Sequence, residues 1–181
     1  EPCFRGREWE YVKDCLDTGW VSSLGEYVNR FEKQLADVAG CRHAIATSSG
    51  TSALHICLEL AGAGLGDEVL VPTLSFVATA NAVKYTGAEP HFVDCDEATL
   101  AVDPALLGSY LGEIGEIRGG TCYNKRTGKR IRALVAVHML GHPCRIDALA
   151  ELASRYHLTL VEDAAEALGS TYRGRHAGQW G

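Results

Sequence analysis

The segment VEDAAEALGS, residues 161–170, brings three acidic residues to the end of an apolar run that is typical of a buried β-strand. We predict this strand over residues 158–165, so that Glu162 and Asp163 lie where it emerges from the sheet. An unpaired charge is costly where water is scarce, and no arginine or lysine is adjacent in the sequence. We therefore expect Asp163 to meet a positive charge that the protein does not itself supply.

The chain before this segment repeats the same succession of strand and helix. We predict strands at 68–71, 90–96 and 133–140, helices at 6–17, 28–38, 75–86 and 146–156, a further helix opening at 103–104, and a short strand, turn and helix within 43–60. Continuously apolar strands that alternate with helices indicate a mostly parallel sheet with both faces covered. The expected fold class is α/β, a three-layer αβα arrangement, as one unit over residues 1–181.

Residues 112–132 differ from the rest because they are rich in glycine and basic residues. We predict a hairpin there that turns near Thr127 and Gly128. Its basic side chains could bind a phosphate, but charge on a hairpin is more often solvated surface, and surface is the favoured interpretation. They are Lys125, Arg126, Lys129, Arg130 and Arg132.

Composition and charge exclude several classes of function. The formal net charge of −6 over 181 residues argues against nucleic acid as a partner, because phosphate binding needs a basic face. No apolar run approaches the length of a membrane span, so no membrane partner is expected. Seven cysteines without a CxxC pair indicate reduced thiols and a cytoplasmic protein. His138, His142 and Cys144 match no common zinc spacing, so no metal site is predicted.

Candidate binding residues stand where the predicted strands end, because ligands of open parallel sheets bind beyond the carboxyl ends of the strands. Four segments stand at such ends and should gather on one edge: 48–52, 73–76, 138–142 and 163–166. Phe76 offers a flat aromatic face there, although an aromatic residue in such a place is more often part of the core.

The SSGTS turn at residues 48–52 precedes a helix whose free N–H groups and dipole suit an anion. Gly50 allows a close backbone approach, and Ser49, Thr51 and Ser52 can add hydrogen bonds. The same residues can equally form an ordinary helix cap, so both interpretations stay open. The turn is not a P-loop, because it has neither the GxxxxGK spacing nor a lysine.

An aromatic nitrogen base would satisfy Asp163, because a carboxylate facing a pyridine nitrogen favours the protonated ring. Pyridoxal phosphate combines that ring with a phosphate for the 48–52 turn and a flat face for Phe76. A generic nucleotide-binding α/β module is the alternative. The GAGLG stretch at 62–66 does not support a dinucleotide fingerprint, since it follows a helix and precedes a strand.

Six segments of the chain resemble the DegT/DnrJ/StrS sugar aminotransferases, which are fold type I enzymes dependent on pyridoxal phosphate. They are GWVSSLGEYVNRFE (19–32), ATSSGTSALH (46–55), GDEVLVPTLSFVATANAV (66–83), GAEPHFVDCD (87–96), VHMLGHP (137–143) and VEDAAEALGSTYRGRHAG (161–178). They follow the order of the family and cover nearly the whole chain. The resemblance implies that residues 1–181 form the N-terminal portion of the large domain that binds pyridoxal phosphate.

The resemblance also implies roles for single residues. Ser49, Gly50 and Thr51 would bind the cofactor phosphate, Phe76 would stack on the ring, and Asp163 would pair with the pyridine nitrogen. Glu166 stands where many members have histidine or glutamine against the other face of the ring. The GWVSS segment and the CYNKRTGKRIRALVAVH insert are most similar to members that act on UDP-linked 4-keto-6-deoxy-N-acetylhexosamines, as in bacillosamine and legionaminic acid synthesis. Substrate contacts would then come from Trp20, Ser22 and Ser23.

One departure from the family concerns the Schiff-base lysine, which the resemblance places after Gly181. The five lysines present are Lys13, Lys33, Lys84, Lys125 and Lys129, and none stands in a matching context. The small C-terminal domain would also be missing. We therefore expect a truncated chain that is not catalytically competent alone, and the resemblance leaves open whether it retains the cofactor.

For the intact parent, the resemblance implies transfer of an amino group from glutamate to a 4-keto-6-deoxy nucleotide sugar in polysaccharide biosynthesis. Two alternatives stay open: a related sugar dehydratase that replaces the lysine with histidine, and a noncatalytic domain of the same fold that serves in binding or assembly. Because family members are homodimers with sites built at the interface, a homodimer is expected.

Overall fold

The computed structural model describes residues 3–181, which divide into two compact units, 3–46 and 47–181. The first unit contains helices α1 (Glu8–Thr18) and α2 (Glu26–Ala39). Each helix ends at a glycine with a left-handed backbone, Gly19 and Gly40, because a residue without Cβ adopts that conformation without strain.

One prediction, for the residues just before 48, differs from the structure. The expected short strand before residue 48 is absent from the described residues: 43–47 form no regular ladder, and Ile45 is 80% exposed. A lone extended segment without a partner strand has nothing to pair its N–H and C=O groups. The apolar stripe of α2 is present in sequence, but neither helix buries a side chain among the described residues.

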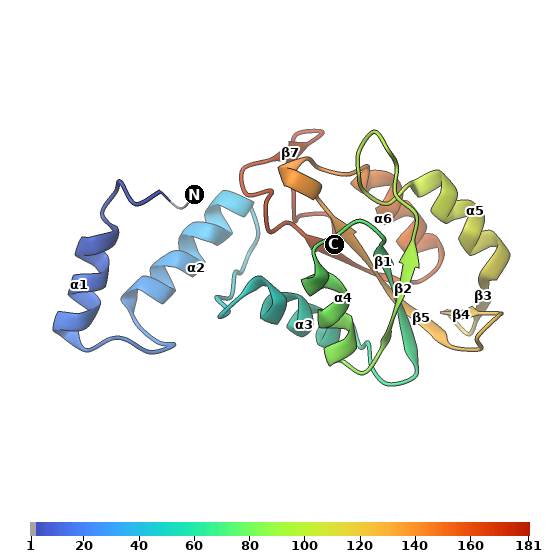
Figure 1. Ribbon diagram of the computed structural model, residues 1–181, viewed down its shortest axis with the longest axis horizontal. Helices are drawn as coiled ribbons and strands as arrows, with labels where there is room; N and C mark the ends of the chain where they lie inside the picture. The colour runs from blue at the N-terminus through green and yellow to red at the C-terminus, as the bar shows by residue number, and fades with distance from the viewer. Residues whose placement is uncertain (1–2) are drawn as a thin grey trace. The chain divides into compact units, whose positions relative to one another are not determined.

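The second unit is built on a mixed, largely parallel sheet, which confirms the expected α/β class (Figure 1). Its strands are β1 (Asp67–Pro72), β2 (Glu89–Val93), β3 (Gly115–Arg118), β4 (Thr121–Asn124), β5 (Arg130–Val137) and β6 (Thr159–Asp163). The order is β2-β1-β5-β4-β3, and β6 pairs with the second half of β5. The pairs β1–β2, β1–β5 and β5–β6 are parallel, so their carboxyl ends meet at one edge.

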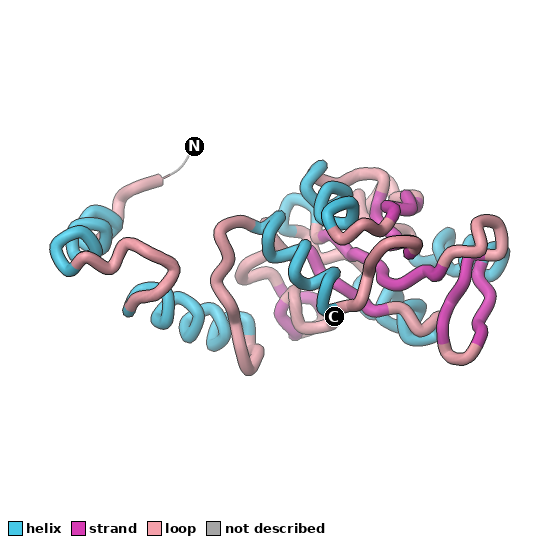
Figure 2. The backbone as a smooth tube through the Cα atoms, turned by 90° about the horizontal axis from the view of Figure 1, so that it is seen from below, coloured by secondary structure: helices cyan, strands magenta, loops and turns pink. Residues whose placement is uncertain are grey.

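Helices cover both faces of this sheet, as the continuously apolar strands predict (Figures 1 and 2). Helices α3 (Gly50–Leu60) and α4 (Val77–Tyr85) pack on one face, and α5 (Pro104–Ile114) and α6 (Ile146–Arg155) on the other. Strand β5 shows why both are needed: Leu134 and Ala136 face α5 and α6, whereas Val135 and Val137 face α3 and α4.

The glycine-rich and basic segment at residues 112–132, called the basic insert from here on, contains two hairpins where we predict one. The predicted turn near residues 127–128 joins β4 to β5, and a second turn at Gly119 and Gly120, both with positive φ, joins β3 to β4. Most of its basic side chains are already paired: Arg130 with Asp67, Arg126 with Glu113, and Lys129 with Glu89, while Arg132 donates to a backbone carbonyl. These partners favour the surface interpretation over phosphate binding.

A buried carboxylate fastens this insert to the sheet. Glu68 accepts hydrogen bonds from Asn124 Nδ2 at 2.9 Å and Thr127 Oγ1 at 2.7 Å, and lies 2.9 Å from His91 Nδ1. Burial by itself would raise the pKa of Glu68, but these hydrogen bonds together lower it below its ordinary value. The polar network lies at the start of β1, which is the opposite end of the strands from the predicted site.

All seven cysteines are free thiols, with Cys122 and Cys144 buried. Cys57, which the helical pattern predicts to face inward, is exposed instead, because α3 turns Leu54 and Leu58 to the core. Across residues 3–181 we find no helix with the length and apolarity that a bilayer crossing demands.

Candidate functional site

The N-terminus of α3 provides free backbone donors. Ser49 is its N-cap: its side chain accepts a hydrogen bond from Ser52 N at 3.2 Å, and its carbonyl accepts one from Ala53 N at 3.0 Å. The N–H groups of Gly50 and Thr51, at the first two helical positions, have no protein acceptor within residues 3–181. The turn is therefore both a helix cap and a potential anion site, as two N–H donors remain available at the positive end of the helix dipole.

The N-terminus of α4 supplies an aromatic side chain at the same sheet edge. Phe76 is the N-cap of this helix, directly after the loop that follows β1, and it is 76% exposed. A phenylalanine that packed into the core would be covered, so the core interpretation does not hold for Phe76. Its ring is available for contact with a flat ligand.

Asp163 ends β6 and presents its carboxylate beyond the sheet. Oδ2 accepts a hydrogen bond from Thr79 Oγ1 at 3.1 Å, and Oδ1 accepts one from Ala165 N at 3.3 Å. Among residues 3–181 no arginine, lysine or histidine forms an ion pair with it. The half-buried carboxylate is thus held by neutral donors, and no protein cation among residues 3–181 neutralises it.

Glu166 is fixed by the turn that follows β5. Its Oε2 accepts a hydrogen bond from Leu140 N at 2.8 Å, and Leu140 and Gly141 both have positive φ. Ser170 Oγ donates to the carbonyl of Gly141 at 2.7 Å, which ties the loop after β6 to the same turn. These two hydrogen bonds join the two loops, and they set the place of Glu166 beside the strand ends.

Gly141→Ala tests whether this contact between the loops is as close as it looks. A Cβ at Gly141 would lie 2.7 Å from the carbonyl oxygen of Glu166, at a φ of +80°. We expect a loss of roughly 2 kcal/mol in the free energy of unfolding, from backbone strain and the collision together. The matched control is Gly128→Ala, where φ is +73° but nothing lies within 4 Å. Equal losses in urea denaturation would contradict the close contact.

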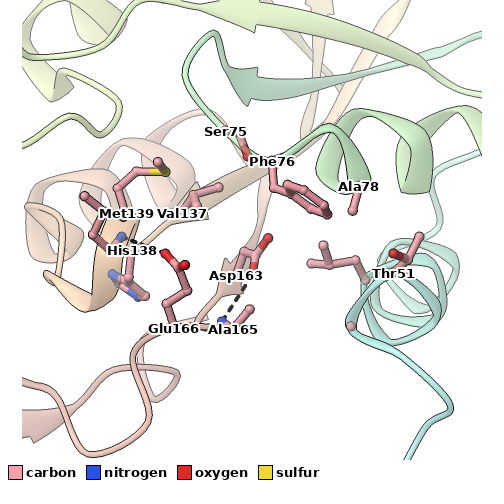
Figure 3. A pocket seen from close by; sticks show the side chains of 13 residues that line it. Thr51, Ser75, Phe76, Ala78, Val137, His138, Met139, Asp163, Ala165 and Glu166 are labelled. Carbon is pink, nitrogen blue, oxygen red and sulfur yellow. Dashed lines mark hydrogen bonds between the residues drawn. The ribbon is translucent and has the colours of Figure 1, made fainter. Parts of the chain in front are cut away.

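These segments enclose a cavity of about 550 Å³, within the size range of small-molecule sites. Its lining includes residues from all four predicted strand-end segments: Gly50, Thr51, Leu54, Ser75, Phe76, Ala78, Val137, His138, Met139, Leu140, Asp163, Ala165 and Glu166. Figure 3 shows Asp163 at the centre of the labelled side chains, with Phe76 and Thr51 on one side and Glu166 and His138 on the other. Ser49 caps the adjoining helix but does not itself line the cavity.

No role is predicted for Glu162 from the sequence. Its side chain is 3% exposed and is not among those that line the cavity. His138 Nδ1 accepts a hydrogen bond from Cys144 N, which places the ring proton on Nε2, 3.0 Å from Glu162 Oε2. The backbone N–H groups of Gly178, Trp180 and Gly181 also donate to Glu162. Burial by itself would raise the pKa of Glu162, but these hydrogen bonds lower it.

No cluster of three or more potential ligating side chains that could hold a metal ion occurs within residues 3–181. His138 is engaged as described, and burial raises the pKa of the Cys144 thiol to about 12, with the nearby charge of Glu162 adding to the effect. A thiol with that pKa remains protonated and is a poor metal ligand.

The predicted substrate residues Trp20, Ser22 and Ser23 lie in the first unit, in the segment between α1 and α2. Trp20 is 60% exposed, and Trp20 and Ser22 line a hollow formed by residues 14–29. Trp20 and Ser22 thus share one hollow that Ser23 does not line, and all three are apart in the chain from the residues that line the cavity.

The cavity fits pyridoxal phosphate in three respects. The N-terminus of α3 offers donors for a phosphate, Phe76 offers an exposed ring, and Asp163 offers a carboxylate without a protein cation. The three features lie around one cavity whose volume suits a ligand of this size. No single feature would identify the ligand, but a phosphorylated pyridine needs all three.

The chain is similar to known proteins in sequence and in fold. GDP-perosamine synthase of Caulobacter vibrioides is 42% identical over 180 residues, and the spore coat polysaccharide biosynthesis protein SpsC of Bacillus subtilis is 37% identical over 180. Each match covers 99% of this chain, but only 44% and 42% of the relative. The crystal structure of 3-amino-5-hydroxybenzoic acid synthase superposes with a TM-score of 0.83 at 30% identity, covering 99% of this chain and 43% of that one.

The chain therefore spans less than half the length of the relatives it matches, and its fold matches the large domain of fold type I aminotransferases. The model of the DegT/DnrJ/EryC1/StrS aminotransferase family, whose members depend on pyridoxal phosphate, matches residues 2–181. With a match over almost every residue, the chain belongs to the DegT/DnrJ/EryC1/StrS aminotransferase family.

Proposed function

We propose that this chain forms the N-terminal portion of a large domain that binds pyridoxal phosphate, and that the cavity around Asp163 is the cofactor site. The observation that carries the proposal is a half-buried carboxylate, without a protein cation among residues 3–181, that faces a cavity shared with a helix N-terminus and an exposed aromatic ring. A ligand that is cationic at one end and anionic at the other suits this arrangement.

Six residues in and beside the cavity have parts in holding the cofactor, Ser49 among them as the cap of the adjoining helix. The N–H groups of Gly50 and Thr51, with the hydroxyls of Ser49 and Thr51, bind the phosphate; Phe76 covers one face of the ring. Asp163 keeps the pyridine nitrogen protonated, because an adjacent negative charge favours the charged form of the ring. Glu166, held by Leu140 N, lies beside the cavity as a further ring contact. When bound, the cofactor supplies the electron sink for amino-group transfer.

The reaction proposed for the whole protein is transfer of an amino group from glutamate to a 4-keto-6-deoxy nucleotide sugar. None of the five lysines of the chain lines the cavity: Lys13, Lys33 and Lys84 lie on α1, α2 and α4, and Lys125 and Lys129 lie in the basic insert. Residues 1–181 are therefore expected to bind the cofactor without forming a Schiff base to it and to be inactive by themselves. We include a homodimer in the proposal.

The nucleotide that carries the sugar could be UDP or GDP, and a different observation favours each. The resemblance of the GWVSS segment and the CYNKRTGKRIRALVAVH insert to family members that act on UDP-linked sugars favours a UDP-linked N-acetylhexosamine, with Trp20, Ser22 and Ser23 as substrate contacts. The relative from Caulobacter vibrioides is named for GDP-perosamine, which favours a GDP-linked sugar. Competition binding to the whole protein separates them: the carrier whose nucleotide displaces the sugar substrate at the lower concentration is the natural one.

Titration of residues 1–181 with pyridoxamine phosphate tests the cofactor proposal. We expect a saturable change in cofactor fluorescence and a rise in melting temperature, because a ligand that binds only the folded state stabilises it. Stabilisation by ADP or NAD and not by pyridoxamine phosphate would instead identify a generic nucleotide-binding module. Self-association of the chain without any cofactor binding would support the noncatalytic assembly domain.

A further inference from the structure

Behind Asp163 lies a buried hydroxyl that the proposed cofactor contacts do not use. Thr79, in the first turn of α4, is only 1% exposed, and its Oγ1 donates to Asp163 Oδ2 at 3.1 Å. Thr79 Oγ1 also lies 2.9 Å from Ser75 Oγ. The three side chains form a continuous row from the cavity wall at Ser75 to the acid at the end of β6.

The direction of this row follows from the number of protons. A threonine hydroxyl has one proton, and Thr79 uses it in the hydrogen bond to the carboxylate. Ser75 must therefore donate its own proton to Thr79 Oγ1, because that oxygen can only accept the second bond. A chain of hydrogen bonds that run in one direction is strengthened by mutual polarisation, and here it points toward the carboxylate.

The row also links two separate parts of the cavity. Ser75 and Thr79 flank Phe76 in the chain, and Thr79 N bonds to Phe76 O at 3.1 Å. The turn that carries the aromatic ring thus holds the acid by side-chain contact across 84 residues of sequence. Displacement of this turn would move the ring and the carboxylate together.

We propose that Thr79, with Ser75 donating to it, is a positioning residue for Asp163: it fixes Oδ2 so that the rest of the carboxylate faces the cavity and the pyridinium nitrogen of the cofactor. This inference rests on the proposed function, because the orientation of the Asp163 carboxylate affects binding only if a pyridine ring occupies the cavity. Thr79 itself is too deeply buried to touch the ligand, and it acts through Asp163 alone.

The test compares four variants of residues 1–181 by titration with pyridoxamine phosphate. Thr79→Val removes the hydroxyl at nearly constant shape, and we expect roughly tenfold weaker binding, the loss typical of a hydrogen bond to a charged group. Thr79→Ser keeps the hydroxyl and should stay within about twofold of the unsubstituted chain. Ser75→Ala should weaken binding about threefold. Thr86→Val is the matched control, because Thr86 bonds to Val83 O at the far end of the same helix.

A second measurement separates positioning from mere support of the fold. The spectrum of bound pyridoxamine phosphate changes when its pyridine nitrogen loses a proton, and a misplaced carboxylate should lower the pH of that change in Thr79→Val but not in Thr79→Ser. The other titratable groups that line the cavity, Glu166 and His138, are common to both variants. A purely structural role would lower the melting temperature and leave this pH unchanged.

The outcomes are distinct. If the unsubstituted chain does not bind pyridoxamine phosphate, the proposed function fails and this inference with it. If it binds, and Thr79→Val matches it in affinity and spectral pH, the positioning role alone is overturned. Should Thr79→Val fail to fold, Ser75→Ala decides: unchanged binding refutes the directed row, and a threefold loss supports it.

Discussion

Asp163→Ala is expected to weaken the binding of pyridoxamine phosphate to residues 1–181 by about a hundredfold or more. The substitution removes the anion that faces the ring nitrogen and leaves a cationic ligand without a counter-charge, at a cost of about 3 kcal/mol or more. Isothermal titration or cofactor fluorescence measures the effect. The fold should survive, because the two donors to Asp163 are a hydroxyl and one backbone N–H at the end of a strand.

Asp163→Asn is the matched variant that separates charge from shape. An asparagine oxygen can still accept the hydrogen bond from Thr79, so the side chain keeps its place while it loses its charge. We expect most of the affinity to be lost in this variant as well, and the bound ring to lose its proton at lower pH. If Asp163→Asn bound the cofactor as the unsubstituted chain does, the electrostatic role of Asp163 would be wrong.

Glu162→Ala is expected to cost about 3 kcal/mol or more in the free energy of unfolding. Its carboxylate accepts hydrogen bonds from His138 Nε2 and from the N–H groups of Gly178, Trp180 and Gly181, and removing it leaves these donors unpaired. Urea denaturation followed by circular dichroism measures the loss. Glu116→Ala is the control, since an exposed pair such as Glu116 and Arg118 contributes little and its loss should stay within about 1 kcal/mol.

The pH dependence of stability follows from the same carboxylate. The pKa of Glu162 is lowered in the folded state, so its contribution is complete above the ordinary glutamate pKa of about 4.3 and is lost as the pH falls through the folded value. Glu68, whose pKa is also lowered, acts in the same direction. Glu162→Gln should therefore unfold over a shallower acid transition, and an unchanged acid transition would contradict the contribution of this group.

The parts of the fold that could be predicted are those whose signal is local. Apolar runs of strand length alternate with helices through residues 67–163, and their burial on both faces follows directly from that pattern. The expected strand before residue 48 is missing because a strand needs a partner, and partners depend on the rest of the chain. The turn at Gly119 and Gly120 was missed because the predicted hairpin at residues 127–128 already accounted for the glycine-rich stretch.

The candidate site, like the fold, has residues that the sequence predicts and residues that it does not. Asp163 ends β6 and Phe76 follows β1, and the rule for parallel sheets brings such strand ends together, while the 49–51 turn reaches the same cavity at the start of α3 without a strand before it. Thr79 and Glu162 could not be found by that rule, because their partners lie far along the chain: Thr79 bonds to an acid 84 residues away, and Glu162 to backbone groups of an irregular segment. Hydrophobic periodicity gives no information on such contacts. Nothing in the sequence distinguishes Thr79 from any other helical threonine, or marks Glu162, beside Asp163, as a buried anchor.

The alternation of side chains along β6 has a consequence for variation in this protein. Val161 and Asp163 belong to the face that carries α3 and α4, whereas Glu162 turns to the opposite face and binds the segment after β8 (Arg175–His176). The proposed ligand contact and the anchorage of a distant loop are thus made by adjacent residues on opposite faces of the sheet, and His138, which lines the cavity and bonds to Glu162, links the two. A single-residue insertion or deletion in this strand would exchange the two acids between the faces and disrupt both sets of contacts at once.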